Sequence, residues 1–190
     1  MIQAVIFDCF GVLTTDGWLA FRERYLDADP QRLERGVASN KRVDAGLISY
    51  DDFIHEVANL AGVSIQQTLS VIEGRTVNEK LFTYIRDQLK PACKIGMLSN
   101  AADDWLDQLF EPWQNKLFDQ TVLSYQVGVI KPDPLMYQTV AERLGVLPEE
   151  CIFIDDQQRY VDGAVGVGMR GVHFTDTQQT MTAIEELLHA

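Results

Sequence analysis

The chain has 190 residues, 46% of them hydrophobic and 23% charged, and it carries a formal net charge of -12 at pH 7. This length suits one hydrophobic core with a small insert, and the composition is typical of a globular protein and not of a disordered chain. An acidic excess without a cluster of Lys and Arg argues against a nucleic-acid surface, and no apolar stretch approaches the ~20 residues that a membrane span requires.

The first predicted element is a buried strand at residues 4–7, an apolar run that stops at Asp8. The pattern from residue 16 to about residue 76 is helical throughout, and its clearest helix covers residues 50–61. The signals are capping residues, helix stops and aromatic residues spaced for one helical face. They are Trp18, Phe21, Tyr25, Asp29, Pro30, Ser49, Gly62 and Ser64. This stretch is therefore predicted to be an α-helical insert.

Beyond the insert, helices alternate with short apolar runs. A helix is predicted at residues 79–90, with Asn78 as its cap, and four further strands are predicted at residues 95–98, 121–123, 151–154 and 171–174. This alternation is typical of a parallel sheet with crossover helices. We therefore predict an α/β fold with a Rossmann-like parallel sheet. Its core is expected to comprise residues 1–15 and 77–190, and a helical cap, residues 16–76, is inserted after the first strand.

The three cysteines, Cys9, Cys93 and Cys151, each lie in or beside an apolar run. This position suits buried thiols in a reducing compartment better than a disulfide framework.

The apolar N-terminal segment has no basic residues ahead of it and contains Asp8, which indicates a strand and not a signal peptide. We therefore expect a cytoplasmic protein with neither a nucleic-acid nor a membrane partner. The oligomeric state is not predicted.

Polar residues follow four of the predicted strands, at the point where each strand ends. They are Asp8, Ser99, Asn100, Lys131, Asp155 and Asp156. Because the carboxyl ends of parallel strands meet at one edge of the sheet, these side chains are expected to converge. Carboxylates, a hydroxyl and an ammonium group gathered in one place are the parts of a phosphoryl-transfer site.

The segments FDCFGVLT, LSN, KPDP and FIDD resemble the four ordered motifs of the haloacid dehalogenase superfamily, and the match covers nearly the whole chain. The insert resembles the C1 helical cap of that family, and the sequence is similar to its small sugar-phosphate phosphatases. The resemblance implies an Mg²⁺-dependent hydrolase that acts on a small phosphorylated metabolite, a phosphate monoester.

The resemblance also implies a role for each residue at the strand ends. Asp8 would be the nucleophile that forms an aspartyl-phosphate. Mg²⁺ would be bound by Asp8, the backbone carbonyl of Phe10 and Asp156. Asp155 would lie behind these ligands or pair with Lys131, and a divalent cation would offset the repulsion between the two adjacent carboxylates.

Three further residues would bind the phosphoryl group. The Ser99 hydroxyl would donate to its oxygens, helped by the Asn100 N-H at the start of a helix, where anions are favoured. Lys131 would place a positive charge on the phosphate and on Asp8.

Two positions depart from the family pattern. Phe10 occupies the position where most phosphatases of the family carry a second Asp, so general acid-base help worth ~10² to 10⁴-fold is missing unless another group supplies it. Tyr160 stands where the last acid is expected, with Asp162 as a weak substitute. Asp16 and Thr15 are the nearest candidates to replace the group lost at Phe10.

Three functions compete. A phosphatase ranks first, and a degenerate member that binds a phosphorylated ligand or a protein without catalysis ranks second, supported by Phe10 and Tyr160. A 2-haloacid dehalogenase ranks third, because an aromatic residue at position 10 favours it but the pair Asp155 and Asp156 argues against it. Substrate choice is expected to depend on cap side chains that reach the site, and the candidates are Trp18, Arg22, Arg24, Lys41 and Arg42.

Overall fold

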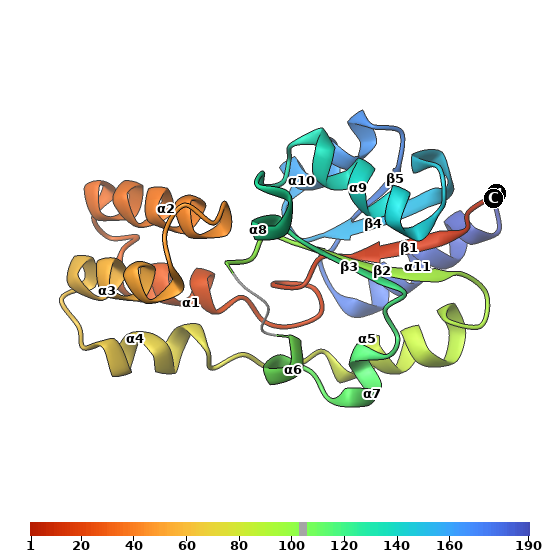
Figure 1. Cartoon of the computed structure of the whole chain (residues 1–190). Helices are drawn as coiled ribbons and strands as arrows, with labels where there is room; N and C mark the ends of the chain where they lie inside the picture. Colours follow the sequence, from red (N-terminus) through yellow and green to blue (C-terminus); the bar gives the residue numbers. More distant parts are fainter. Residues whose placement is uncertain (103–105) are drawn as a thin grey trace.

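The computed structural model describes residues 1–102 and 106–190, and within these ranges five strands form one sheet (Figure 1). All neighbouring strands are parallel, in the order β3-β2-β1-β4-β5. The strands are β1 (Ala4–Phe7), β2 (Lys94–Ser99), β3 (Gln120–Leu123), β4 (Cys151–Asp155) and β5 (Arg170–His173). The predicted α/β fold with a Rossmann-like parallel sheet is confirmed, and each strand lies within a residue of its predicted bounds.

Helices cover both faces of this sheet. They are α5 (Glu79–Tyr84), η1 (Ile85–Leu89), α6 (Leu106–Leu109), α7 (Pro112–Asn115), α8 (Ser124–Val127), α9 (Pro134–Leu144), η2 (Pro148–Glu150), α10 (Gln158–Gly166) and α11 (Thr177–Leu188). Successive residues of β1 point to opposite faces. Val5 and Phe7 therefore pack in the cluster under α5 and α11, whereas Ala4 and Ile6 pack in the cluster under α9 and α10. This double burial explains why the strands read as continuous apolar runs.

The helix predicted at residues 79–90 changes type halfway along. It begins as the α-helix α5 and continues as the π-helix η1, in which the Lys90 N-H donates to the Ile85 carbonyl at 2.8 Å. Leu81, Ile85 and Leu89 are all buried in the core. Their spacing fits a helix of either kind, so the sequence pattern did not distinguish the two.

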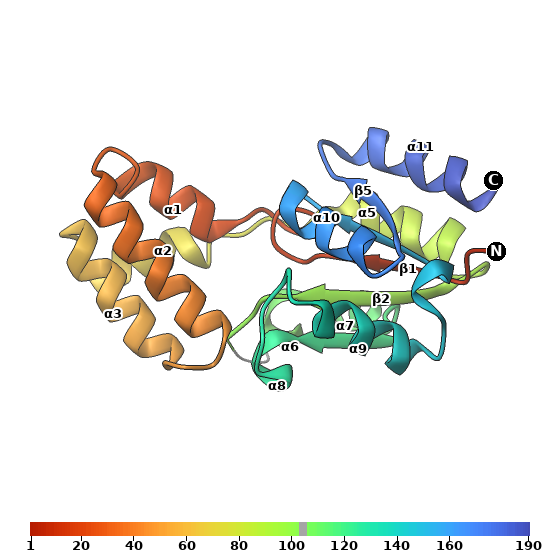
Figure 2. The ribbon, with the colours of Figure 1, turned by 90° about the horizontal axis from the view of Figure 1, so that it is seen from above.

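Four helices lie between β1 and α5: α1 (Gly17–Tyr25), α2 (Pro30–Asp44), α3 (Tyr50–Ala61) and α4 (Ile65–Ile72). We call them the cap helices. They pack around a hydrophobic cluster of their own, to which Phe21, Val57 and Ile72 belong. Figure 2 shows them beyond the carboxyl ends of the strands. The predicted residues at the helix N-termini act as N-caps: the Ser49 hydroxyl accepts from the Asp52 N-H, and Ser64 forms a capping box.

The chain enters and leaves the cap helices at neighbouring points. Thr14 pairs with Val77 in an antiparallel bridge. The Thr15 N-H donates to the Thr76 carbonyl at 3.0 Å, and the Thr76 N-H donates to the Thr15 hydroxyl at 2.9 Å. Across the described ranges, no helix combines the length and the apolar character needed to cross a membrane.

Candidate active site

The carboxyl ends of β1 and β4 bring a buried lysine between two aspartates. Lys131 Nζ lies 2.7 Å from Asp8 Oδ1 and 2.6 Å from Asp155 Oδ2. Lys131 is 1% exposed, Asp8 5% and Asp155 0%. The ion pairs are therefore shielded from water and hold Asp8 in a fixed orientation.

The charge on Lys131 is secured by its neighbours. Burial alone would lower the pKa of this ammonium group, but the carboxylates of Asp155 and Asp8 reverse the effect and raise the pKa above its usual value. The Nζ atom also lies 5.3 Å from the ring centroid of Phe153 and 5.0 Å from that of Tyr160. Both rings present their negative faces to the cation. Lys131 thus supplies a permanent positive charge at the strand ends.

Three carboxylates at this edge could hold a metal ion. Asp8, Asp155 and Asp156 each offer one oxygen, and the three oxygens lie within 4.8 Å of one another. Both carboxylate oxygens of Asp155 already accept hydrogen bonds, Oδ2 from Lys131 Nζ and Oδ1 from the Gln157 N-H at 2.9 Å. Asp156 Oδ1 is buried and has no hydrogen-bond partner among the described residues. Burial and the charge of Asp155 raise the pKa of Asp156 to about 6.

Mg²⁺ fits this donor set. A hard divalent cation takes carboxylate and carbonyl oxygens as ligands. It would satisfy the orphaned Asp156 oxygen and offset the repulsion that raises the pKa of this carboxyl.

A tight loop connects Asp8 to the cap helices and leaves no room beside Asp156. The N-H groups of Leu13 and Thr14 both donate to the Cys9 carbonyl at 2.9 Å. Gly11 has a φ of 97°, and a Cβ atom there would lie 2.5 Å from Asp156 Oδ2. Only glycine suits both the left-handed backbone and this close approach.

The loop carries Phe10 at the bottom of a cavity. The Arg75 guanidinium lies 4.6 Å from the Phe10 ring centroid. Phe10 thus presents an aromatic ring at the position where the resemblance to the family predicts an acid, and this ring cannot transfer a proton.

Ser99 ends β2 and Asn100 follows it, so both lie at the carboxyl end of this strand as predicted, but they make different contacts. Asn100 Oδ1 accepts from the Lys131 N-H at 2.8 Å, so this side chain connects the ends of β2 and the Lys131 loop. Ser99 is fully buried, and as the structure describes it, Ser99 does not line the cavity. The expected helix start at Asn100 is wrong, because the next helix in the described part of the chain is α6. A serine and an asparagine suit a loop as well as a helix start, which explains the error.

The other sequence candidates are dispersed. Tyr160 lines the cavity, and its hydroxyl accepts from Arg159 at 2.8 Å. Asp162 is exposed and accepts from Gln158. Thr15 is exposed, whereas Asp16 lines the cavity and caps α1 by accepting from the Leu19 N-H at 3.1 Å.

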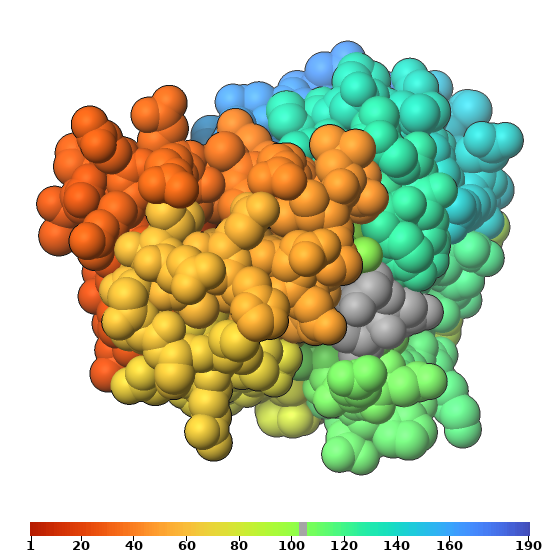
Figure 3. All heavy atoms as spheres, turned by 60° about the vertical axis from the view of Figure 1, so that its left-hand side comes forward, coloured from red at the N-terminus to blue at the C-terminus, as the bar shows by residue number. Residues whose placement is uncertain are grey.

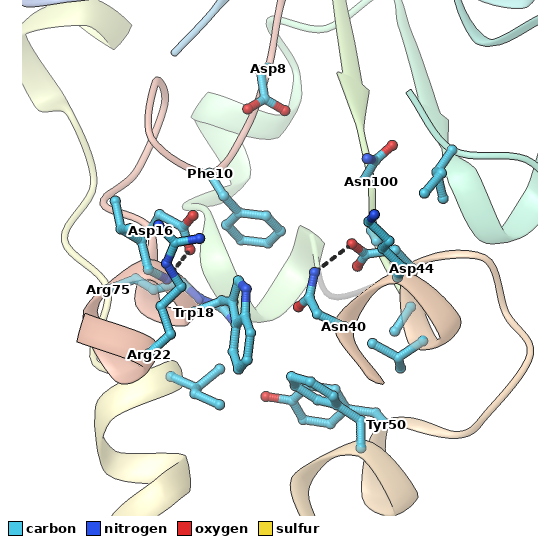
Figure 4. Close-up of a pocket in the computed structure, with 18 of the residues that line it drawn as sticks. Asp8, Phe10, Asp16, Trp18, Arg22, Asn40, Asp44, Tyr50, Arg75 and Asn100 are labelled. Atoms are coloured by element: carbon cyan, nitrogen blue, oxygen red, sulfur yellow. Dashed lines mark hydrogen bonds between the residues drawn. The ribbon is translucent and has the colours of Figure 1, made fainter. Parts of the chain in front are cut away.

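The cavity, of about 890 Å³, lies between the cap helices and the strand ends (Figure 4). Of the cap residues considered from the sequence, Trp18, Arg22 and Lys41 line it. Arg24 and Arg42 do not line it in the described structure. Arg42 instead pairs with Glu56 at 3.2 Å.

Sequence reasoning missed Asp44, at the C-terminal end of α2. This residue lines the cavity, and its Oδ2 accepts from Asn40 Nδ2 at 2.9 Å. Burial and the nearby charge of Asp16 raise the pKa of Asp44 to about 7. An acidic residue in the last turn of a helix opposes the helix dipole, and this was the signal that could have identified it.

Known proteins resemble this chain in sequence and in fold. A family model of haloacid dehalogenase-like hydrolases matches residues 2–168. A sesquiterpene phosphatase of Aspergillus oryzae is 29% identical over 98% of this chain and 96% of its own length. A phosphatase of Mycobacterium tuberculosis is 27% identical over 96% of this chain and 92% of its own length. The solved structure of a predicted HAD-like family hydrolase from Porphyromonas gingivalis has a TM-score of 0.74 and 26% identity, and covers 100% of this chain and 99% of that one.

Proposed function

The chain belongs to the haloacid dehalogenase-like hydrolases, and from this premise we propose that it is a phosphatase that hydrolyses a small phosphate monoester through an aspartyl-phosphate on Asp8. The observation that carries the proposal is the buried pairing of Asp8 with Lys131 beside the unpartnered oxygen of Asp156. The similarity to two proteins named as phosphatases supports it.

Asp8 is the proposed nucleophile. Lys131 holds it by Oδ1, which fixes the orientation of the carboxylate, and the positive charge of Lys131 offsets the repulsion between this carboxylate and an incoming phosphate. The bond that forms joins an Asp8 oxygen to phosphorus, and the bond that breaks joins phosphorus to the ester oxygen. Asp155 is a positioning residue here, because it holds Lys131 from the other side.

Asp8 and Asp156 would hold Mg²⁺, together with the carbonyl of Phe10 and with Asp155 behind them. When bound, this ion would neutralise charge on the phosphoryl oxygens. The Asn100 N-H and the Ser99 hydroxyl stay the proposed donors to the same oxygens; Asn100 lines the cavity, whereas Ser99 lies buried behind it and donates to the Asn100 carbonyl in this structure.

The organic part of the substrate would occupy the cavity under the cap, for which we keep the proposed bounds 16–76. The cavity is wide enough for a small metabolite. Trp18 offers it an aromatic surface, and Arg22 and Lys41 offer positive charge.

The test measures phosphate release from a panel of phosphate monoesters, with the full chain and added Mg²⁺. The Asp8→Asn variant is expected to lose more than about 10³-fold in kcat/KM, because it lacks the nucleophile. Asp162→Asn, an equivalent change at an exposed position, should match wild type. Equal activity of the Asp8→Asn variant and wild type would contradict the proposal, as would full activity after complete removal of divalent cations.

A binding protein without catalysis is the second candidate, and Phe10 is the observation that favours it. It predicts that Mg²⁺ and inorganic phosphate together raise the melting temperature while no ester in the panel is hydrolysed. Dehalogenation remains third, since Asp155 and Asp156 bring more negative charge than an attack on carbon needs. Halide release from a chloro-acid without added metal would reverse this order.

A further inference from the structure

The proposed phosphatase reaction needs a proton donor that the strand ends do not supply. An ester oxygen that leaves phosphorus must gain a proton, and the Phe10 side chain cannot provide one. The described carboxylates at this edge are already assigned to attack or to metal binding, and Lys131 is held between two of them. The donor must therefore be sought across the cavity.

We propose that Asp44, from cap helix α2, is the general acid and general base that takes over the role lost at Phe10. This inference rests on the phosphatase function proposed above. Asp44 lines the same cavity as Asp8 and Lys131 and approaches it from the cap side (Figure 4). That is the side on which the leaving group of a phosphate held at the strand ends would lie.

The Asp44 carboxyl is held by one oxygen and open at the other. Asn40 Nδ2 donates to Oδ2 at 2.9 Å, and Oδ1 has no hydrogen-bond donor within the described ranges. A carboxyl group that is oriented by a hydrogen bond to one oxygen, with its other oxygen free to carry a proton, has the arrangement that a general acid requires.

A core residue fixes the position of Asp44. The Ser124 hydroxyl donates to the Asp44 carbonyl oxygen, and the same hydroxyl accepts from the Ala101 N-H at 2.9 Å. Ser124 is fully buried. Figure 3 shows the orange surface of α2 meeting the teal surface of the segment that begins with α8. The end of α2 is thereby anchored beside the loop that follows β2.

The surroundings favour a protonated carboxyl near neutral pH. Burial and the negative charge of Asp16, at the start of α1, raise the pKa of Asp44, while Lys131 acts in the opposite direction. Tyr160 of α10 lines the same cavity. A pKa of about 7 is close to the ideal for a group that must first give and then accept a proton.

Asp16, the candidate considered from the sequence, is less suited to this role. Its Oδ1 accepts from the Leu19 N-H, a bond that favours the carboxylate form. Burial raises the pKa of Asp16, but this hydrogen bond and the charges of Arg75 and Arg22 oppose the rise.

The two half-reactions balance with Asp44 in this role. In the first, an Asp8 oxygen bonds to phosphorus, the ester bond breaks, and the Asp44 proton moves to the departing oxygen, which leaves as an alcohol. In the second, the Asp44 carboxylate takes a proton from water, the water oxygen bonds to phosphorus, and the bond to Asp8 breaks. Inorganic phosphate leaves, and both carboxyl groups return to their starting forms.

The experiment compares two esters that differ in their need for a proton. 4-Nitrophenyl phosphate has a leaving group that departs unprotonated, whereas the alkoxide of n-butyl phosphate must be protonated. Asp44→Asn should lower kcat/KM about 10²-fold or more for n-butyl phosphate and less than about 10-fold for 4-nitrophenyl phosphate. The pH profile for n-butyl phosphate should also lose its decline at high pH.

Controls separate this inference from the function on which it rests. Glu34→Gln, which removes a charge from the exposed side of α2, should leave both rates unchanged. Equal losses on the two esters in Asp44→Asn would indicate a structural role and overturn the inference, as would the selective loss appearing in Asp16→Asn instead. If wild type hydrolyses 4-nitrophenyl phosphate but not n-butyl phosphate, the Asp44 role fails and the phosphatase function stands. If wild type hydrolyses neither ester nor any other in the panel, the phosphatase function fails too.

Discussion

Carboxyl groups around the cavity lower the stability of the folded chain at neutral pH. Burial and neighbouring charges raise the pKa of Asp44 to about 7 and that of Asp156 to about 6, from an ordinary value near 3.8. At a pH between the ordinary and the raised pKa, each of these groups binds more protons in the folded state than in the unfolded state. The contribution of these two groups to the free energy of unfolding therefore falls as pH rises from about 4 to about 7.

Asp44→Asn should accordingly stabilise the metal-free protein. Because Asn cannot ionise, the variant avoids the cost of a partly buried charge, and its free energy of unfolding should exceed that of wild type by about 1–3 kcal/mol at pH 8. The gain should shrink as pH falls and vanish below about pH 4, where wild type is protonated in both states. Urea denaturation at pH 8, 6 and 4 measures this. A gain that does not depend on pH would rule out the buried charge as its cause, and Glu34→Gln should show no such trend.

Most residues of the candidate site, but not all of them, could be predicted from the sequence. Asp8, Asp155 and Asp156 could be predicted because each directly follows or ends a strand, and parallel strands bring those positions together. Lys131 comes after β3 and helix α8, and it could be predicted from its KPDP segment. Asp44 could not be placed in this way. Its location depends on its contact with Ser124, 80 residues further along the chain, and no local pattern encodes that contact.

At the scale of elements, local signals predicted the cap helices well. In α4 the Ser64 hydroxyl accepts from the Gln67 N-H at 3.2 Å, and Gln67 Oε1 accepts from the Ser64 N-H at 3.0 Å. This reciprocal pair satisfies two N-H groups that the first turn of the helix would otherwise leave without a partner.

Ser64→Ala should therefore lower the free energy of unfolding by about 0.5–2 kcal/mol. Ser70→Ala is the matched control, because Ser70 is exposed within the same helix and the change improves helix propensity. Thermal and chemical unfolding of the two variants give the comparison. Equal stability losses in Ser64→Ala and Ser70→Ala would show that the N-cap hydrogen bond of Ser64 does not account for the loss.

Element types were harder to predict where packing decides them. The π-helix η1 and the loop after Ser99 both departed from expectation. In each case the residues suit two backbone conformations. Contacts with distant parts of the chain then choose between them, as when Ser124 accepts from the Ala101 N-H.

For the molecule as a whole, a net charge of -12 and three close carboxylates make a bound cation stabilising. Mg²⁺ at about 100 times its Kd should raise the free energy of unfolding by about 2.7 kcal/mol. For a chain of this size the melting temperature should then rise by about 5–10 °C. Asp156→Asn should lose most of this rise, and NaCl at the same ionic strength should not reproduce it. A full rise in the Asp156→Asn variant would contradict the proposed site.

The pairing of Thr15 with Thr76 has a consequence for how the molecule can be altered. Because the segment that carries the four cap helices departs and returns at adjacent points, its removal leaves two chain ends already in contact. A short turn could join them without moving a strand. The same geometry would accept a segment of different length, so that the helices over the cavity could be exchanged as a module while Asp8, Lys131 and Asp156 stay in place.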